Sequence, residues 1–191
     1  MELLASLENN GLAIWLRESP SVLGYPTLLA FHTFGMAFLV GTSVAIALRV
    51  LGIASGVPLA PLTKFFPLMQ VAFAISLVSG ALLLMLDLTL FLTMGTFYIK
   101  LLAIVAALIF LRLLRARVLS AGAGEGIGSA PTEAQILAGA MLLSWVIAIT
   151  AGRLTAYAAY IGWQSAAAVL VLAVILLVGR SIALRFWGAN T

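Results

Sequence analysis

The apolar residues of this chain occur in long runs rather than in the mixed pattern of a soluble protein. A run of about 20 apolar residues is long enough to cross a bilayer as a helix, and short stretches with Pro, Gly or charge separate these runs. The predicted spans are residues 25–51, 64–87, 96–118, 134–158 and 164–186. The pattern predicts an all-α membrane protein, a polytopic bundle of five transmembrane helices forming a single domain.

Residues 1–20 precede the first span and have a different pattern. Polar Asn9 and Asn10 interrupt the apolar residues, and Glu2 stands where a cleaved signal peptide would have basic residues. We expect the segment to be retained as a short interfacial helix, with Trp15 as an aromatic anchor at the headgroups.

Two connections differ from the others. Residues 120–131 form a glycine-rich loop, which follows a helix instead of a strand and so does not match a dinucleotide-binding turn. The connection Leu88–Met94 is apolar, and we expect it to dip into the membrane interface. If residues 88–94 instead form a re-entrant segment, the orientation predicted below changes.

The composition agrees with a membrane protein and excludes several functions. Hydrophobic residues make up 64% of the chain and charged residues 8%, whereas roughly a quarter of the residues in soluble domains are charged. The net charge is +4, but the basic residues flank the apolar runs and form no patch with aromatics, so we expect no nucleic-acid partner. With no cysteine, disulfides and thiolate catalysis are excluded. No Ser-His-Asp set, carboxylate pair or zinc signature is present, which favours a non-enzymatic protein.

The basic residues predict the orientation, because cytoplasmic loops retain Lys and Arg. One side of the membrane receives Arg49, Lys64, Arg112, Arg115, Arg117, Arg180 and Arg185, and the other side receives Arg17, Lys100 and Arg153. We therefore expect a bacterial inner-membrane protein with a periplasmic N-terminus, a cytoplasmic glycine-rich loop and a cytoplasmic C-terminus.

Small residues at four-residue spacing predict the packing faces, since they let helix backbones approach in lipid. The first span has Thr33, Ala37, Gly41 and Ala45, the second has Ala72, Ser76 and Gly80, and the fourth has Ala140, Ser144, Ala148 and Gly152. We take Gly41, Gly80, Ser144 and Gly152 as helix-packing positions. Spans one, two and four are predicted to form the close-packed centre, with the fifth at the periphery.

Four ionisable residues lie toward the outer side of the spans, namely His32, Asp87, Lys100 and Arg153. Such groups are costly in a bilayer unless they are paired or hydrated, so we predict that they form one polar cluster near the periplasmic face. Two alternatives stay open. Lys100 and Arg153 are close enough to helix ends to snorkel to the headgroups, and Asp87 is suited to cap its helix or to pair with Lys100.

His32 is the only histidine, and it lies two turns, roughly 10 Å, below the outer end of its span. At 100° per residue it is about 180° from Gly41 on the helix. The first helix must therefore present these two residues to different neighbours. A hydrogen bond from His32 to a hydroxyl or backbone carbonyl of a neighbouring helix is the alternative to a functional site.

Three methionines, Met36, Met85 and Met94, lie toward the same side. Thioethers and an imidazole suit Cu(I) or an axial haem position, although methionine is also a flexible core residue. The cofactor hypotheses are copper or haem b held by His32 with a methionine, or a haem shared between two copies of His32 in a homodimer.

Several motifs together resemble a group of uncharacterised bacterial inner-membrane proteins assigned to a domain of unknown function. The matching stretches are Trp15–Ser19, Tyr25–Pro26, His32 with Gly35 and Gly41, Leu48–Gly52, Ser79–Leu83, Phe97–Leu102, Leu143–Trp145 and Ala151–Arg153. The resemblance implies that His32, Arg49, Lys100 and Arg153 are characteristic polar positions, and it implies no activity.

The chain departs from that family's pattern at two places. Ala47-Leu48 stands where the family has an Asp, and Leu111–Leu114 lacks a histidine that is frequent there. Any site that needs the second histidine is therefore in doubt. A looser likeness, to copper-resistance protein D and four-helix cytochrome b membrane domains, rests on His32 followed by glycines.

These observations lead to competing functional hypotheses. The first is a non-enzymatic accessory or anchor subunit of a redox- or transport-linked assembly, with a membrane protein partner or a homo-oligomer. The alternative is a small copper- or haem-handling membrane protein that uses His32. A third is a quinone pocket formed by His32, Lys100 and Arg153.

Overall fold

The computed structural model of the protein describes residues 2–53, 56–58, 60–119, 130–155 and 171, and the regular structure in these ranges is helical. The short helices are α1 (Glu2–Glu8), α2 (Gly11–Glu18), the 3-10 helix η1 (Ala60–Phe65), α5 (Leu88–Thr93) and the π-helix η2 (Arg115–Leu119). The long helices are α3 (Tyr25–Val50), α4 (Phe66–Leu86), α6 (Gly95–Leu114) and α7 (Thr132–Thr155).

Four segments are long and apolar enough to cross a membrane. They are Tyr25–Val50, Pro61–Leu86, Gly95–Arg117 and Thr132–Thr155. The all-helical fold predicted from the hydropathy pattern is confirmed, and these segments coincide with the first four predicted spans. The fifth predicted span, residues 164–186, lies outside the described residues, so the count of five stays a prediction.

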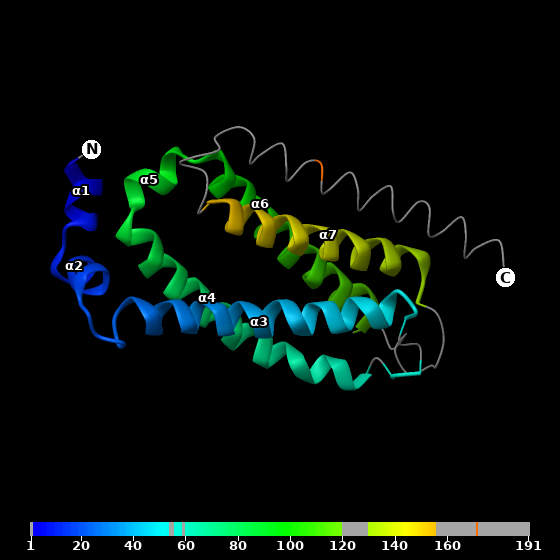
Figure 1. The fold of residues 1–191 in the computed structure, drawn as a ribbon. Coiled ribbons are helices and arrows are strands. Elements are labelled where there is room, and N and C mark those ends of the chain that lie inside the picture. Colours follow the sequence, from blue (N-terminus) through cyan, green and yellow to red (C-terminus); the bar gives the residue numbers. More distant parts are fainter. Residues whose placement is uncertain (1, 54–55, 59, 120–129, 156–170, 172–191) are drawn as a thin grey trace.

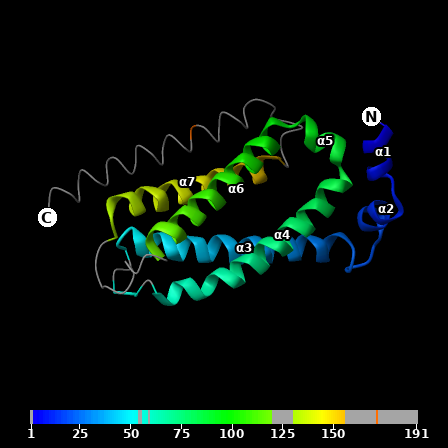
Figure 2. The same cartoon turned by 180° about the vertical axis from the view of Figure 1, so that it is seen from behind.

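The long helices run alternately in opposite directions and form an open bundle (Figures 1 and 2). α3 packs along α4 and also contacts α7, while α6 packs along α7. α4 and α6 make few contacts with each other, so the described bundle is open between them. The neighbours therefore follow the order α4, α3, α7, α6.

The centre of the bundle includes α6, which the small-residue pattern had not placed there. Ala103 and Ala107 of α6 are buried, as are Ala138 and Trp145 of α7, and all four belong to one apolar cluster. Two alanines one turn apart are enough for close approach, because longer apolar side chains such as Leu111 continue the same face. The prediction that spans one, two and four alone form the centre was wrong on this point.

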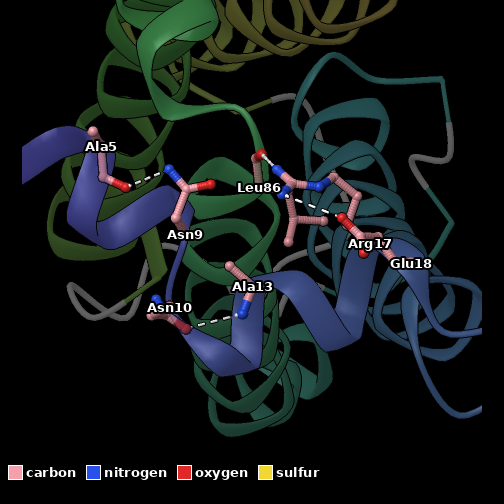
Figure 3. Close-up of polar contacts among 7 residues, drawn as sticks. All are labelled: Ala5, Asn9, Asn10, Ala13, Arg17, Glu18 and Leu86. Carbon is pink, nitrogen blue, oxygen red and sulfur yellow. Dashed lines mark hydrogen bonds and ion pairs between the residues drawn. The ribbon is translucent and has the colours of Figure 1, made fainter.

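Residues 2–18 form two short helices instead of one, because Asn10 begins a new helix. The Asn10 side-chain oxygen accepts hydrogen bonds from the backbone N–H groups of Leu12 and Ala13, both at 2.9 Å, which is the usual N-cap arrangement. Figure 3 shows Arg17 reaching from α2 to the end of α4, where its Nη1 donates to the carbonyl of Leu86 at 3.0 Å. This bond satisfies a helix-terminal carbonyl and holds α2 against α4.

The connection after α4 is the short helix α5, which joins neighbouring ends of α4 and α6 (Figure 1). The backbone N–H of Thr89 donates to the carboxylate of Glu8, so α1 and α5 lie together at this end. Residues 88–94 thus link two oppositely directed spans. We call this end, with α1, α2 and α5, the outer end, and the end with η1 and η2 the inner end.

Candidate functional site

His32 lies where α3 crosses α4, and its ring nitrogen Nδ1 connects the two helices. Nδ1 is 3.0 Å from the carbonyl oxygen of Ser76 and 3.2 Å from the hydroxyl of Ser79. A carbonyl oxygen only accepts, so Nδ1 bears the hydrogen and donates it. In the neutral ring Nε2 is then the acceptor, and no residue in the described ranges hydrogen-bonds it.

Two glycines make this close crossing possible. A Cβ on Gly35 would lie 2.4 Å from the Ser76 hydroxyl oxygen and 2.8 Å from the carbonyl oxygen of Ala72, and a Cβ on Gly80 would lie 3.0 Å from Cε1 of His32. Both distances at Gly35 are too short for real atoms, and Ala72 contributes rigid backbone. Gly80, predicted as a packing position, makes room for the imidazole in particular.

Lys100 of α6 lies near His32 at the outer end of the bundle. Its aliphatic stem runs along Gly152 of α7, where a Cβ would lie 3.5 Å from Cδ and 3.6 Å from Cε. The Lys100 side chain is partly buried and lies within electrostatic range of His32, although no hydrogen bond joins the two side chains. Within the described parts of the chain no carboxylate forms an ion pair with Lys100.

Asp87 and Arg153, the other two members of the predicted cluster, form no hydrogen bond or ion pair with His32 or Lys100 in the described ranges. Asp87 is exposed at the end of α4, and Arg153 is exposed near the end of α7. The ion pair between Asp87 and Lys100 that the sequence left open is not formed. His32 and Lys100 therefore constitute the candidate site, with the Thr155 hydroxyl 3.5 Å from the Thr96 hydroxyl at the same end of α6 and α7.

The three methionines proposed as metal or haem ligands are dispersed. Met36 packs against the central apolar cluster, Met85 accepts a hydrogen bond from the Asn10 amide at 3.3 Å, and Met94 is buried at the start of α6. The hydrogen bonds of His32 run to α4 alone. The described residues contain no group of three or more His, Cys, Asp or Glu side chains arranged to hold a metal.

The remaining predicted packing positions lie in different surroundings. Ser144 is buried and its hydroxyl donates to the carbonyl of Ala140 at 2.8 Å. Gly152 contacts Lys100, as described above. Gly41 is exposed, and no described atom lies within 4 Å of where its Cβ would be.

Sequence reasoning missed the structural roles of two residues, Arg49 and Gly35. Arg49 was counted as a loop-flanking charge and, within the family resemblance, as a characteristic polar position, but its burial was not predicted: the residue is only 1% exposed and its Nε donates to the carbonyl of Val57 in the proline-containing connection. Gly35 was noted only within the family resemblance. Its position three residues after His32 was the available signal, because that spacing puts both on one helix face.

Comparisons with protein-family models, with curated proteins and with solved structures give no match. The functional proposal therefore rests on the contacts and burial of His32 and Lys100.

Proposed function

We propose that this chain is a non-enzymatic membrane subunit that anchors or supports a redox- or transport-linked assembly, and that Lys100 receives an acidic group from a partner. The observation on which this rests is a partly buried lysine, near His32, that has no carboxylate partner in the described ranges. A lysine at membrane depth costs about 2.5–3.5 kcal/mol when nothing compensates its charge. An acidic group from another chain would remove most of that cost.

The outward face of α3 supports the same proposal. Thr33, Ala37, Gly41 and Ala45 are all exposed, and Gly41 has open space beside it among the described residues. Small residues at this spacing suit close approach of another helix. In this proposal, the helix that covers this face belongs to a partner protein or to a second copy of the chain.

The proposed setting is a bacterial inner membrane, with membership of the resembled family, a periplasmic N-terminus and a cytoplasmic C-terminus. In support of the orientation, the basic residues Arg49, Lys64, Arg112, Arg115 and Arg117 all belong to the elements of the inner end, at the end of α3, in η1, at the end of α6 and in η2. Basic residues accumulate on the cytoplasmic side of membrane proteins. In this orientation His32 and Lys100 are in the periplasmic half.

Single-cysteine cross-linking tests the partner, because the chain contains no cysteine of its own. In native membranes Gly41→Cys is expected to cross-link to a second chain through a short thiol reagent. Leu102→Cys, at an exposed position of α6, is the control and is expected to cross-link weakly. Mass measurement of the product distinguishes a homodimer from a complex with another protein.

Lys100→Gln is the matching test of the charge. It is expected to release the partner in mild detergent, whereas Arg153→Gln, which removes an exposed cation one residue from Gly152, should retain it. A wild-type protein that is monomeric and free of partners in native membranes would refute the proposal. Equal behaviour of the two substitutions would refute the assignment to Lys100.

The second candidate is a copper- or haem-handling protein, which one specific observation favours. His32 donates from Nδ1 to a backbone carbonyl, and metal-ligating histidines usually hold their second nitrogen in this way, leaving Nε2 for the metal. Met36 lies one turn farther along α3 and is the nearest of the three methionines in sequence. Copper or haem b would then be bound by Nε2 together with a thioether or with His32 of a second copy.

An absorption spectrum and elemental analysis of the purified protein test this candidate. A Soret band, or stoichiometric copper that is lost in His32→Ala, would support it. Protein that lacks both, together with unchanged metal tolerance of cells expressing His32→Ala, would end it.

A further inference from the structure

A groove of about 510 Å³ lies at the inner half of the bundle, where α4 and α6 diverge. Its floor is formed by Leu39 of α3 and Met69 of α4, both buried, and its walls include Phe73 of α4 and Leu108 of α6. This volume falls in the usual range of ligand pockets, roughly 300–1,000 Å³. The groove is separate from the His32–Lys100 site, which lies in the outer half.

The mouth of the groove is polar and cationic. Arg112 and Arg115, from the end of α6 and the start of η2, line it together with Gln70 of α4. The Arg115 guanidinium stacks over the Phe66 ring at 4.5 Å from the ring centroid, which fixes a cation at the junction of α4 and η2. Arg112 is exposed and forms no ion pair with a described carboxylate.

The surroundings of the mouth have one sign of charge. In the described ranges, the basic residues of this end are Arg49, Lys64, Arg112, Arg115 and Arg117, whereas its carboxylates are limited to Glu133. Glu133 is paired with Arg117 at 3.5 Å. Arg112 therefore offers an anion entering the groove a cation that no described carboxylate neutralises.

We propose that this groove binds one anionic phospholipid, with its phosphate between Arg112, Arg115 and Gln70 and an acyl chain along Phe73 and Leu108. Guanidinium groups bind phosphate by paired hydrogen bonds, and basic pockets between membrane helices bind the headgroups of anionic lipids. The apolar floor distinguishes a lipid from free phosphate, because inorganic phosphate would leave that surface uncovered. The proposal needs no partner protein and is independent of the function proposed above.

Quenching by brominated lipids tests it in the full-length chain. In a background in which the four native tryptophans are replaced by phenylalanine, F73W places a reporter in the groove, and F38W places one on an exposed part of α3 that does not line it. Each variant is reconstituted in vesicles of phosphatidylcholine with a minority of phosphatidylglycerol, and either lipid is brominated in turn. The F73W reporter is expected to show quenching by phosphatidylglycerol well above its share of the lipid, whereas the F38W reporter should follow bulk composition.

Substitutions at the mouth identify the cause of the preference. Arg112→Gln combined with Arg115→Gln should lower the preference about tenfold, and Lys at both positions should retain part of it. Arg117→Gln, at the same end but outside the groove, should leave it unchanged, and added inorganic phosphate should not compete. Helix content measured by circular dichroism shows that the variants are folded.

Three outcomes would overturn the proposal. Equal quenching of the F73W reporter by the two lipids would mean that the groove does not select charge. A preference that survives the double substitution would mean that the arginines do not cause it. Quenching by neither lipid would mean that protein fills the groove, either a segment of this chain or a partner helix.

Discussion

The two faces of α3 have opposite surroundings although both contain small residues. On one face His32 and Gly35 lie against α4, so closely that a single added carbon at Gly35 would overlap the backbone of Ala72. On the other face Gly41 has open space beside it in the described bundle. The helical wheel predicts that these faces are opposed, and the structure decides which of them is closed.

A small residue therefore permits close packing of helices but does not specify it. What distinguishes the closed face is a polar side chain that finds a backbone partner outside its own helix. His32 finds the carbonyl of Ser76 at 3.0 Å, and Arg49 finds the carbonyl of Val57. In an apolar environment a hydrogen bond of this kind selects one rotation of a helix among several that would fill space equally well.

The largest expected effect is that of Gly35→Val. The added atoms must force α3 and α4 apart, which should lower the free energy of unfolding by about 3 kcal/mol, as measured by denaturation in mixed micelles. Gly41→Val is the matched control and should fold as the wild type does. If the two variants were equally destabilised, the comparison of the two faces would be wrong.

Arg49→Met is expected to have the next largest effect. It removes a hydrogen bond from a buried charged group to the connection after α3, which should cost about 2 kcal/mol. Thermal unfolding in detergent measures it. Lys64→Met, which removes an exposed charge at the same end, is the control. If it lowered the free energy of unfolding as much as Arg49→Met does, the effect would come from charge alone.

His32→Ala should have a smaller effect on stability. Losing the bond to Ser76 is expected to lower the free energy of unfolding by about 1 kcal/mol. Thr33→Ala, a neighbouring exposed residue whose hydroxyl bonds only within its own helix, should cost less than half of that by the same denaturation. If His32→Ala left stability unchanged, the histidine would not stabilise the packing of α3 on α4. That result would favour a ligand-binding role for Nε2.

Gly41→Ala should have the smallest effect on the isolated chain. Because nothing described lies within 4 Å of the new carbon, the change should raise stability by less than about 1 kcal/mol through the better helix propensity of alanine. Hydrogen exchange along α3 measures it residue by residue. Clear destabilisation would instead show that another helix covers this face in the isolated protein.

Much of the local structure could be predicted from the sequence. The ends of α3 follow from where its apolar run stops, and the change of helix at Asn10 follows from its side chain, which caps α2. Asp87 illustrates the limit, because the sequence places it at the outer end of α4 but does not say whether it turns toward Lys100. It is exposed.

Hydropathy alone predicts a helical protein with spans of membrane length, and the helical repeat alone puts His32 and Gly41 on opposite sides of one of them. These properties depend on hydropathy and on the repeat of a single helix, which are local. The contact of His32 with Ser76, the proximity of Lys100 and the burial of Arg49 become visible when the helices are packed together. Such contacts depend on the relative rotation and axial shift of helices, and a chain with few polar residues contains few local signals for either.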